Sequence, residues 1–191
     1  MRGAPTRMTD SHVTRAGEKL EAALKKFGVS AAGKICADLG SHKGGFVDCL
    51  LQRGAAKVHS VDTSYGTLAW ELRKDPRVVV HERRNALHWR PPETIDVVSI
   101  DVGWTRQEHI LPHVFSWNPA PRIVISLLKP HYEAEEGELI KGVLPDALGE
   151  AAVERVLAKL KALNLPSPEV MESPIRGGAG NREFLLGFAA S

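Results

Sequence analysis

Residues 34–46, KICADLGSHKGGF, combine a short apolar run with a carboxylate and a glycine-rich turn. The run KICADL has the length and the apolar content of a buried β-strand, and Asp38 lies near its carboxyl end. Gly40, Gly44 and Gly45 follow, and an apolar pattern typical of a helix begins after them. A strand, a glycine-rich turn and a helix in this order are typical of an open α/β sheet that holds a ligand where its strands end.

The rest of the chain repeats the alternation of strand and helix. Further strands are expected at 57–62, 77–82, 96–101, 122–128, 168–175 and 183–190, and helices at 14–27, 44–54, 66–75, 105–115 and 148–163. The last two strands are expected to form a hairpin. The order predicts a Rossmann-like α/β fold with a doubly wound, mostly parallel seven-stranded sheet and an antiparallel last strand.

Length and composition favour one domain. The chain has 191 residues, of which 43% are hydrophobic, enough for one sizeable core. We expect a flexible tail at 1–12 and a single domain at 13–191. The chain shows neither a run of about 18 apolar residues nor the apolar centre of a secretion signal, so a soluble, cytoplasmic protein is expected. Cys36 and Cys49 lie in apolar segments without a CxxC pairing, and both are expected to be reduced and buried.

Charge is distributed unevenly along the chain. The net charge is +2, but residues 1–93 carry 16 Lys and Arg against 10 Asp and Glu, and residues 94–191 carry 9 against 13. A basic front half can meet a polyanion such as RNA, because neutralised phosphates release counterions. Charge alone equally fits a solvated surface.

The residues of the turn discriminate between three classes of ligand. The dinucleotide pattern GxGxxG fails because His42 takes the place of the middle glycine, and the phosphate-binding Walker pattern fails because Phe46 stands where lysine is required. S-adenosylmethionine fits better, since it has no phosphate and requires only that backbone lie against its methionine part. Asp38 can hold its ammonium group, and Asp62, which ends the next strand, can bind its ribose hydroxyls. The cofactor-binding residues expected are Asp38, Gly40, Ser41, Gly44, Gly45, Phe46, Asp62, Thr63, Asn85, Ala86 and Asp101, with Asn85 and the Ala86 backbone at the adenine edge.

With these segments in view, the sequence resembles the FtsJ-like methyltransferases, and among them the TlyA-type (hemolysin A-like) ribosomal RNA 2'-O-methyltransferases. The segments that carry the resemblance are TRAGEKLEAALKKFGV, DLGSHKGGFVDCLLQRGAAKVHSVD, YGTLAWELRKDPRVVVHERRNA, IDVGW, LLKPHYEA and SPIRGGAGNREFLL. The resemblance implies a class I methyltransferase that uses S-adenosylmethionine to methylate RNA, in particular ribosomal RNA or a ribosomal subunit. Relatives usually carry a small N-terminal RNA-binding domain, and only about a dozen residues precede the first expected helix here.

The resemblance also implies a catalytic tetrad of Lys19, Asp101, Lys129 and Glu183. Asp101 and Lys129 lie at the carboxyl ends of expected strands, where open α/β sheets hold ligands, whereas Lys19 and Glu183 rest on the resemblance alone. The reaction implied is in-line attack of a ribose 2'-oxygen on the sulfonium methyl. Two roles remain open for Lys129: a base, if its pKa falls, or a charged group that stabilises the developing alkoxide. The direction of that pKa shift cannot be read from the sequence.

Other side chains are weaker candidates. Trp104 and Tyr132 flank Asp101 and Lys129 and are the best choices for aromatics that stack on an RNA base. His109 and His113 lie four residues apart but lack the glutamate of a zinc-protease helix, so no metal is expected. The alternatives are a non-catalytic RNA- or cofactor-binding protein of the same fold, and a membrane-active hemolysin, for which the apolar segments leave no spare surface because the sheet and helices use them. Oligomeric state stays open.

Overall fold

A computed structural model of the protein describes residues 12–189 and shows one seven-stranded sheet in the order β3-β2-β1-β4-β5-β7-β6. Neighbouring strands pair in parallel except at β7, which runs antiparallel to both β5 and β6. The predicted fold class and the terminal hairpin are therefore confirmed. The strands are β1 Ile35–Leu39, β2 Lys57–Val61, β3 Val78–His81, β4 Val97–Ile100, β5 Ile123–Leu128, β6 Glu169–Glu172 and β7 Phe184–Ala189.

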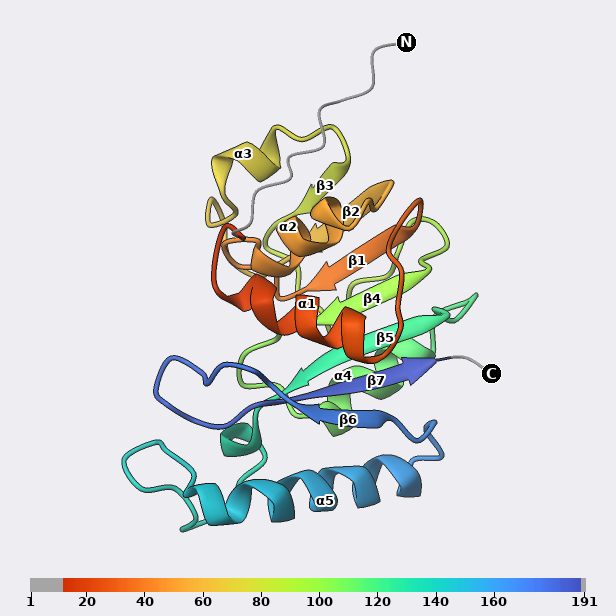
Figure 1. The fold of residues 1–191 in the computed structure, drawn as a ribbon. Helices are drawn as coiled ribbons and strands as arrows, with labels where there is room; N and C mark the ends of the chain where they lie inside the picture. Colours follow the sequence, from red (N-terminus) through yellow and green to blue (C-terminus); the bar gives the residue numbers. More distant parts are fainter. Residues whose placement is uncertain (1–11, 190–191) are drawn as a thin grey trace.

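Helices cover both faces of the sheet (Figure 1). One apolar cluster joins the sheet to α1 and α2, and a second joins it to α4 and α5. The helices are α1 Ala16–Lys26, α2 Gly45–Gln52, α3 Trp70–Arg73, α4 Gln107–Phe115 and α5 Asp146–Ala162, with a 3-10 turn, η1, at Pro130–Tyr132. Two buried layers of this kind are what a doubly wound sheet requires, since both of its faces must leave water.

Helix α1 forms where the apolar spacing predicts it. Leu20, Ala23 and Leu24 are buried against the sheet layer, and Gly28 takes a positive φ of 65° just after the helix ends. Helix α3 is shorter than the expected 66–75 and covers only Trp70–Arg73. Residues 1–11 of the expected tail lie outside the described residues.

Strand register brings three residues to one edge. Leu39 pairs with Val61 on one side and with Ile100 on the other. The next residue of each strand is therefore at the carboxyl end of the sheet: Gly40, Asp62 and Asp101. A ligand site is expected at this edge, and the strand order reverses between β1 and β4.

Among the helices of residues 12–189, none combines the length and the apolar character needed to cross a bilayer.

Candidate active site

A cavity of about 560 Å³ opens at the carboxyl ends of β1, β2, β4 and β5. It contains most of the expected nucleoside-binding residues and two of the expected catalytic ones. The residues that line it are Gly40, His42, Val61, Asp62, Thr63, Arg84, Asn85, Ala86, Leu87, Asp101, Val102, Gly103, Trp104, Thr105, Ile110 and Lys129. A smaller cavity of about 70 Å³ shares Gly40, His42 and Asp101 with it and extends under the glycine turn.

The glycines of the turn are needed for close approach. A side chain at Gly40, where φ is 89°, would overlap the backbone carbonyl of Asp101, so glycine lets the ends of β1 and β4 meet. Side chains at Gly44 and Gly45 would overlap Leu72 and Thr14. The sequence pattern predicts that Gly44 and Gly45 contact a ligand. The structure shows that their lack of a side chain admits neighbouring protein, although Gly45 also lines the smaller cavity.

Asp38 is a fully buried carboxylate at the smaller cavity. Its Oδ1 accepts a hydrogen bond from Ser99 Oγ at 2.7 Å, and its Oδ2 has no partner among residues 12–189. Burial raises the pKa of Asp38 to about 8; the Ser99 hydrogen bond opposes this rise, and the Asp101 and Asp62 carboxylates add to it. A buried oxygen with a free lone pair fits a cationic ligand group, because an ammonium would supply the missing donor and favour the ionised form.

Ser41 and Phe46 also line the smaller cavity, and both are buried. Ser60 Oγ donates to Ser41 Oγ at 2.7 Å, which fixes the serine against β2. Phe46 belongs to the apolar cluster under α1 and α2 and forms an apolar part of the wall. The sequence could not distinguish this packing role from direct contact with a ligand.

Asp62 projects into the larger cavity from the end of β2. Its Oδ2 accepts from the His42 backbone N–H at 2.8 Å and its Oδ1 accepts from the Ser64 backbone N–H at 2.7 Å. Burial acts to raise the pKa of Asp62, but the hydrogen bonds from Ser64 and His42 lower it below its usual value. An ionised carboxylate held in this way can accept hydrogen bonds from vicinal hydroxyls, and Thr63 lies exposed beside it.

Asn85 and Ala86 form the wall beyond β3. Asn85 Oδ1 accepts from the Leu87 backbone N–H at 2.9 Å, which closes a tight turn, while Ala86 is buried. The turn places both residues, which the sequence predicts at the adenine edge, on the larger cavity. Arg84 and Leu87 line the same wall and were not predicted.

Two lysine–carboxylate ion pairs contain the four expected catalytic residues. Lys129 Nζ lies 2.6 Å from Asp101 Oδ1, next to the larger cavity. Lys19 on α1 pairs with Glu183, which directly precedes β7, and both side chains are buried. Gly177 admits the Glu183 carboxylate, since a Cβ there would lie 2.5 Å from Glu183 Oε1.

The charge of Lys129 is decided by its surroundings. Burial acts to lower the pKa of Lys129, but the adjacent Asp101 carboxylate, with Tyr132 and Glu183, raises it above its ordinary value. The influence of Glu183 links the two ion pairs electrostatically. Lys129 is thus an ammonium at neutral pH in this arrangement, which favours the charged of the two roles that the sequence left open.

Two aromatic rings stack beside Lys129. The rings of Trp104 and Tyr132 lie 4.8 Å apart at 28°, and Lys129 Nζ is 5.5 Å from the Tyr132 ring. Trp104 is 87% exposed, which is unusual for so large an apolar side chain. An exposed, flat ring at the mouth of a cavity can stack on a planar ligand.

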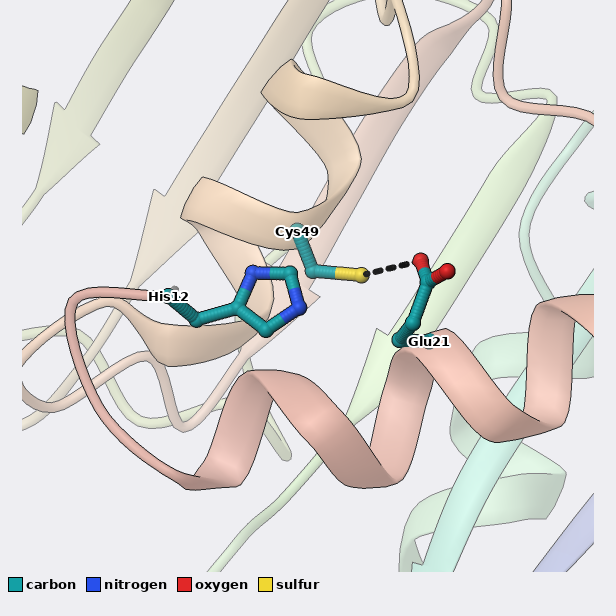
Figure 2. A group of neighbouring side chains, drawn as sticks. All are labelled: His12, Glu21 and Cys49. Atoms are coloured by element: carbon teal, nitrogen blue, oxygen red, sulfur yellow. Dashed lines mark hydrogen bonds between the residues drawn. The ribbon is translucent and has the colours of Figure 1, made fainter. Parts of the chain in front are cut away.

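A group of metal-ligating side chains lies elsewhere, between α1, α2 and the segment before α1 (Figure 2). His12, Glu21 and Cys49 offer ligand atoms within 4.8 Å of one another. However, Arg53 and Lys25 already pair with Glu21, and burial, with Asp48, raises the pKa of Cys49 to about 12. The thiol therefore stays protonated and donates to Glu21 (Figure 2), and we assign no metal to this group.

Some residues reach the site only through packing, and the sequence does not predict them. Thr14 lines the smaller cavity because α1 packs over the glycine turn, and Thr105 lines the larger one ahead of α4. No local pattern marks these residues. His113 contacts the Trp89 carbonyl at 2.8 Å, so it serves the core rather than a site with His109.

Comparison with known proteins gives consistent matches. The model of the FtsJ-like methyltransferase family matches residues 12–190. The 16S/23S rRNA (cytidine-2'-O)-methyltransferase TlyA of Mycobacterium tuberculosis is 37% identical over 96% of this chain and 71% of its own length. Hemolysin A of Brachyspira hyodysenteriae is 37% identical over 93% of this chain and 76% of its own. The crystal structure of a candidate hemolysin from Lactococcus lactis superposes with a TM-score of 0.87 and is 35% identical, covering 96% of this chain and 90% of that one.

Proposed function

Because the chain belongs to the FtsJ-like methyltransferase family, it is an S-adenosylmethionine-dependent methyltransferase, and we propose that its methyl acceptor is a ribose 2'-hydroxyl of RNA. The observation that carries this proposal is the pairing of Lys129 with Asp101 at the mouth of the cavity, beside exposed Trp104. Ribosomal RNA is the proposed substrate, in the free form or within a ribosomal subunit, since the related TlyA protein is named for rRNA. The proposed place of action is the cytoplasm.

The two cavities share three lining residues, and the chemistry of their walls fits the cofactor. In our proposal Asp38 Oδ2 receives the ammonium of the methionine part in the smaller cavity. Asp62 accepts hydrogen bonds from the ribose hydroxyls, and Asn85 with the Ala86 backbone meets the adenine edge. Gly40, Ser41, Gly44, Gly45, Phe46 and Thr63 complete the proposed binding surface. The bound cofactor supplies a methyl group already activated by its sulfonium.

The protein then has two tasks: to align the acceptor oxygen with the methyl group and to stabilise the charge that develops on it. Lys129 meets the second task as an ammonium, because Asp101 keeps it protonated and directed. Water takes the hydroxyl proton in this mechanism. The Glu183 carboxylate of the buried Lys19–Glu183 pair acts electrostatically on Lys129, so we assign this pair a role in holding Lys129 in place.

Trp104 and Tyr132 are proposed to bind the base of the target nucleotide. Stacking on an aromatic ring is worth about 1–3 kcal/mol per base and needs no particular base identity. The two rings are already stacked beside Lys129, with an angle of 28° between their planes. A base held there would bring its own ribose toward the ammonium.

Methyl transfer from radiolabelled S-adenosylmethionine to total RNA of the source cell tests the proposal. We expect label in RNA with the wild-type protein and none with Lys129→Ala, while calorimetry shows that both bind S-adenosylhomocysteine. Binding by the wild type without any transfer would instead mark a non-catalytic protein of this fold. Wild-type transfer by Lys129→Ala would remove Lys129 from the mechanism.

A further inference from the structure

Glu133 is a buried carboxylate that lies outside the tetrad. It directly follows η1 and is 6% exposed. Its Oε1 accepts a hydrogen bond from the backbone N–H of Gln107, the first residue of α4, at 2.8 Å. Its Oε2 has no hydrogen-bond partner within the described part of the chain. A carboxylate in this position is costly to bury, so its contact calls for an explanation.

Gln107 extends this contact to the strand that leads to Lys129. Its Nε2 donates to the Leu127 carbonyl at 3.1 Å, and its Oε1 accepts from Ser126 Oγ at 2.7 Å. Gln107 is itself buried. The first residue of α4 is therefore tied both to the end of β5 and to Glu133.

Helix α4 is capped from a distance. Arg106 occupies the N-cap position and makes no side-chain cap hydrogen bond, so Glu133, 26 residues away, satisfies the first backbone donor. A local serine, threonine or aspartate would cap the helix without burying a charge. The distant cap does something that a local one would not: it joins two segments that both carry residues of the site.

Those two segments are the loop before α4 and the turn after β5. The loop carries Trp104, whose backbone is held at a φ of 58°, a conformation that a large side chain adopts only when its neighbours enforce it. The turn carries Lys129 and Tyr132. The Glu133–Gln107 hydrogen bond thus joins the same two segments that meet in the Trp104–Tyr132 stack, and it helps to hold Trp104 against Tyr132.

We propose that Glu133 is a positioning residue for methyl transfer: it fixes the Trp104 loop against the Lys129 turn, and so sets where the target nucleotide lies relative to the ammonium. This inference rests on the proposed function. In-line transfer needs the acceptor oxygen aligned with the methyl group, and a misplacement of about 1 Å can cost about 100-fold in rate. Glu133 contacts neither cavity, so its loss acts on placement of RNA rather than on cofactor binding.

Two substitutions and one control test this role. Glu133→Gln keeps an oxygen that can accept from Gln107, and Glu133→Ala removes the cap. Glu136→Gln, three residues on and exposed, is the matched control. Steady-state kinetics with RNA, calorimetry with S-adenosylhomocysteine and hydrogen exchange of the peptide that spans 101–111 are measured for each.

We expect kcat for RNA to fall at least about tenfold in Glu133→Ala and less in Glu133→Gln, with affinity for S-adenosylhomocysteine within twofold of wild type. Exchange at the start of α4 should accelerate in the same order, and Glu136→Gln should match wild type. Wild-type kcat in both Glu133 variants, or a loss of cofactor affinity that parallels the loss of kcat, would overturn the inference. If Glu133→Ala does not fold, the comparison of Glu133→Gln with Glu136→Gln decides. Absence of transfer by the wild-type protein would refute the proposed function, and with it this role.

Discussion

Replacing Lys129 with methionine removes the ammonium that faces Asp101 and keeps a side chain of similar length. The Nζ of Lys129 lies 2.6 Å from Asp101 Oδ1, and 15% of its side chain is exposed. The unpaired Asp101 side chain is 22% exposed and can take up water. We therefore expect the fold to lose only about 1–2 kcal/mol, a value between those of an exposed and a fully buried ion pair. The variant should therefore fold and bind S-adenosylhomocysteine as wild type does.

The effect on catalysis should be far larger than the effect on stability. Removal of one preorganised donor that faces a developing oxyanion typically costs about 100- to 1000-fold in kcat, or about 2.7–4 kcal/mol. Lys129→Arg supplies the comparison, because it keeps the charge but changes its shape. We expect Lys129→Arg to retain more activity than Lys129→Met.

The pH dependence separates the two roles of Lys129. Asp101 raises the pKa of Lys129 above its ordinary value, so the group stays protonated from pH 6 to 9 and its stabilising contribution is lost only at a pH above that range. Wild-type kcat should then show no rise from deprotonation of Lys129 between about pH 6 and 9. Titration of Lys129 should likewise leave the difference in melting temperature between wild type and Lys129→Met unchanged across this pH range. Single-turnover methyl transfer and thermal melts across this range measure both. A rise in kcat that disappears in Lys129→Met, with Lys129→Arg equally inactive, would refute the charged role.

Three further substitutions follow from the same structure. Asp38→Asn should weaken binding of S-adenosylhomocysteine at least about tenfold. Because burial raises the pKa of Asp38 to about 8, the wild-type fold loses stability as pH rises to that value, so the melting temperature of the variant relative to wild type should increase from pH 5 to 8.5. An equal difference at both pH values would contradict this. Gly40→Ala should lower the free energy of unfolding by at least about 2 kcal/mol in chemical denaturation, since it combines a positive φ with overlap at Asp101. Gly28→Ala, which has a positive φ but open space around it, should lower it by about 1 kcal/mol, and equal losses in the two variants would argue against the overlap. Trp104→Ala should change the free energy of unfolding by less than about 0.5 kcal/mol because the ring is exposed, and it should raise KM for RNA about tenfold because stacking is worth about 1–3 kcal/mol. An unchanged KM would exclude the stacking role.

The sequence sufficed for the features that depend on local pattern. The sheet, its antiparallel last strand and the strand ends at Asp62 and Asp101 all follow from the alternation of apolar runs and turns. Lys129 follows in the same way, because it ends a strand. Gly40 was identified as a residue of close approach, although its neighbour is the Asp101 backbone.

Features that depend on distance between remote segments could not be derived from local pattern. Lys19 and Glu183 are 164 residues apart, and only the family resemblance linked them before the structure paired them. The direction of the Lys129 pKa shift depends on the 2.6 Å contact with Asp101, which no spacing encodes. Glu133 is the first residue of the acidic stretch EAEEGE at 133–138, yet it is buried, and its contact with Gln107 joins residues 26 positions apart.

The position of the transferred methyl group tests the central claim most directly. A methyl group on a ribose 2'-oxygen blocks alkaline cleavage of the adjoining phosphodiester, because the hydroxyl that attacks the phosphorus is gone. RNA labelled by the wild-type protein with radioactive S-adenosylmethionine should therefore release its label in alkali-resistant dinucleotides. Release of the label in mononucleotides would place the methyl group on a base and contradict the account.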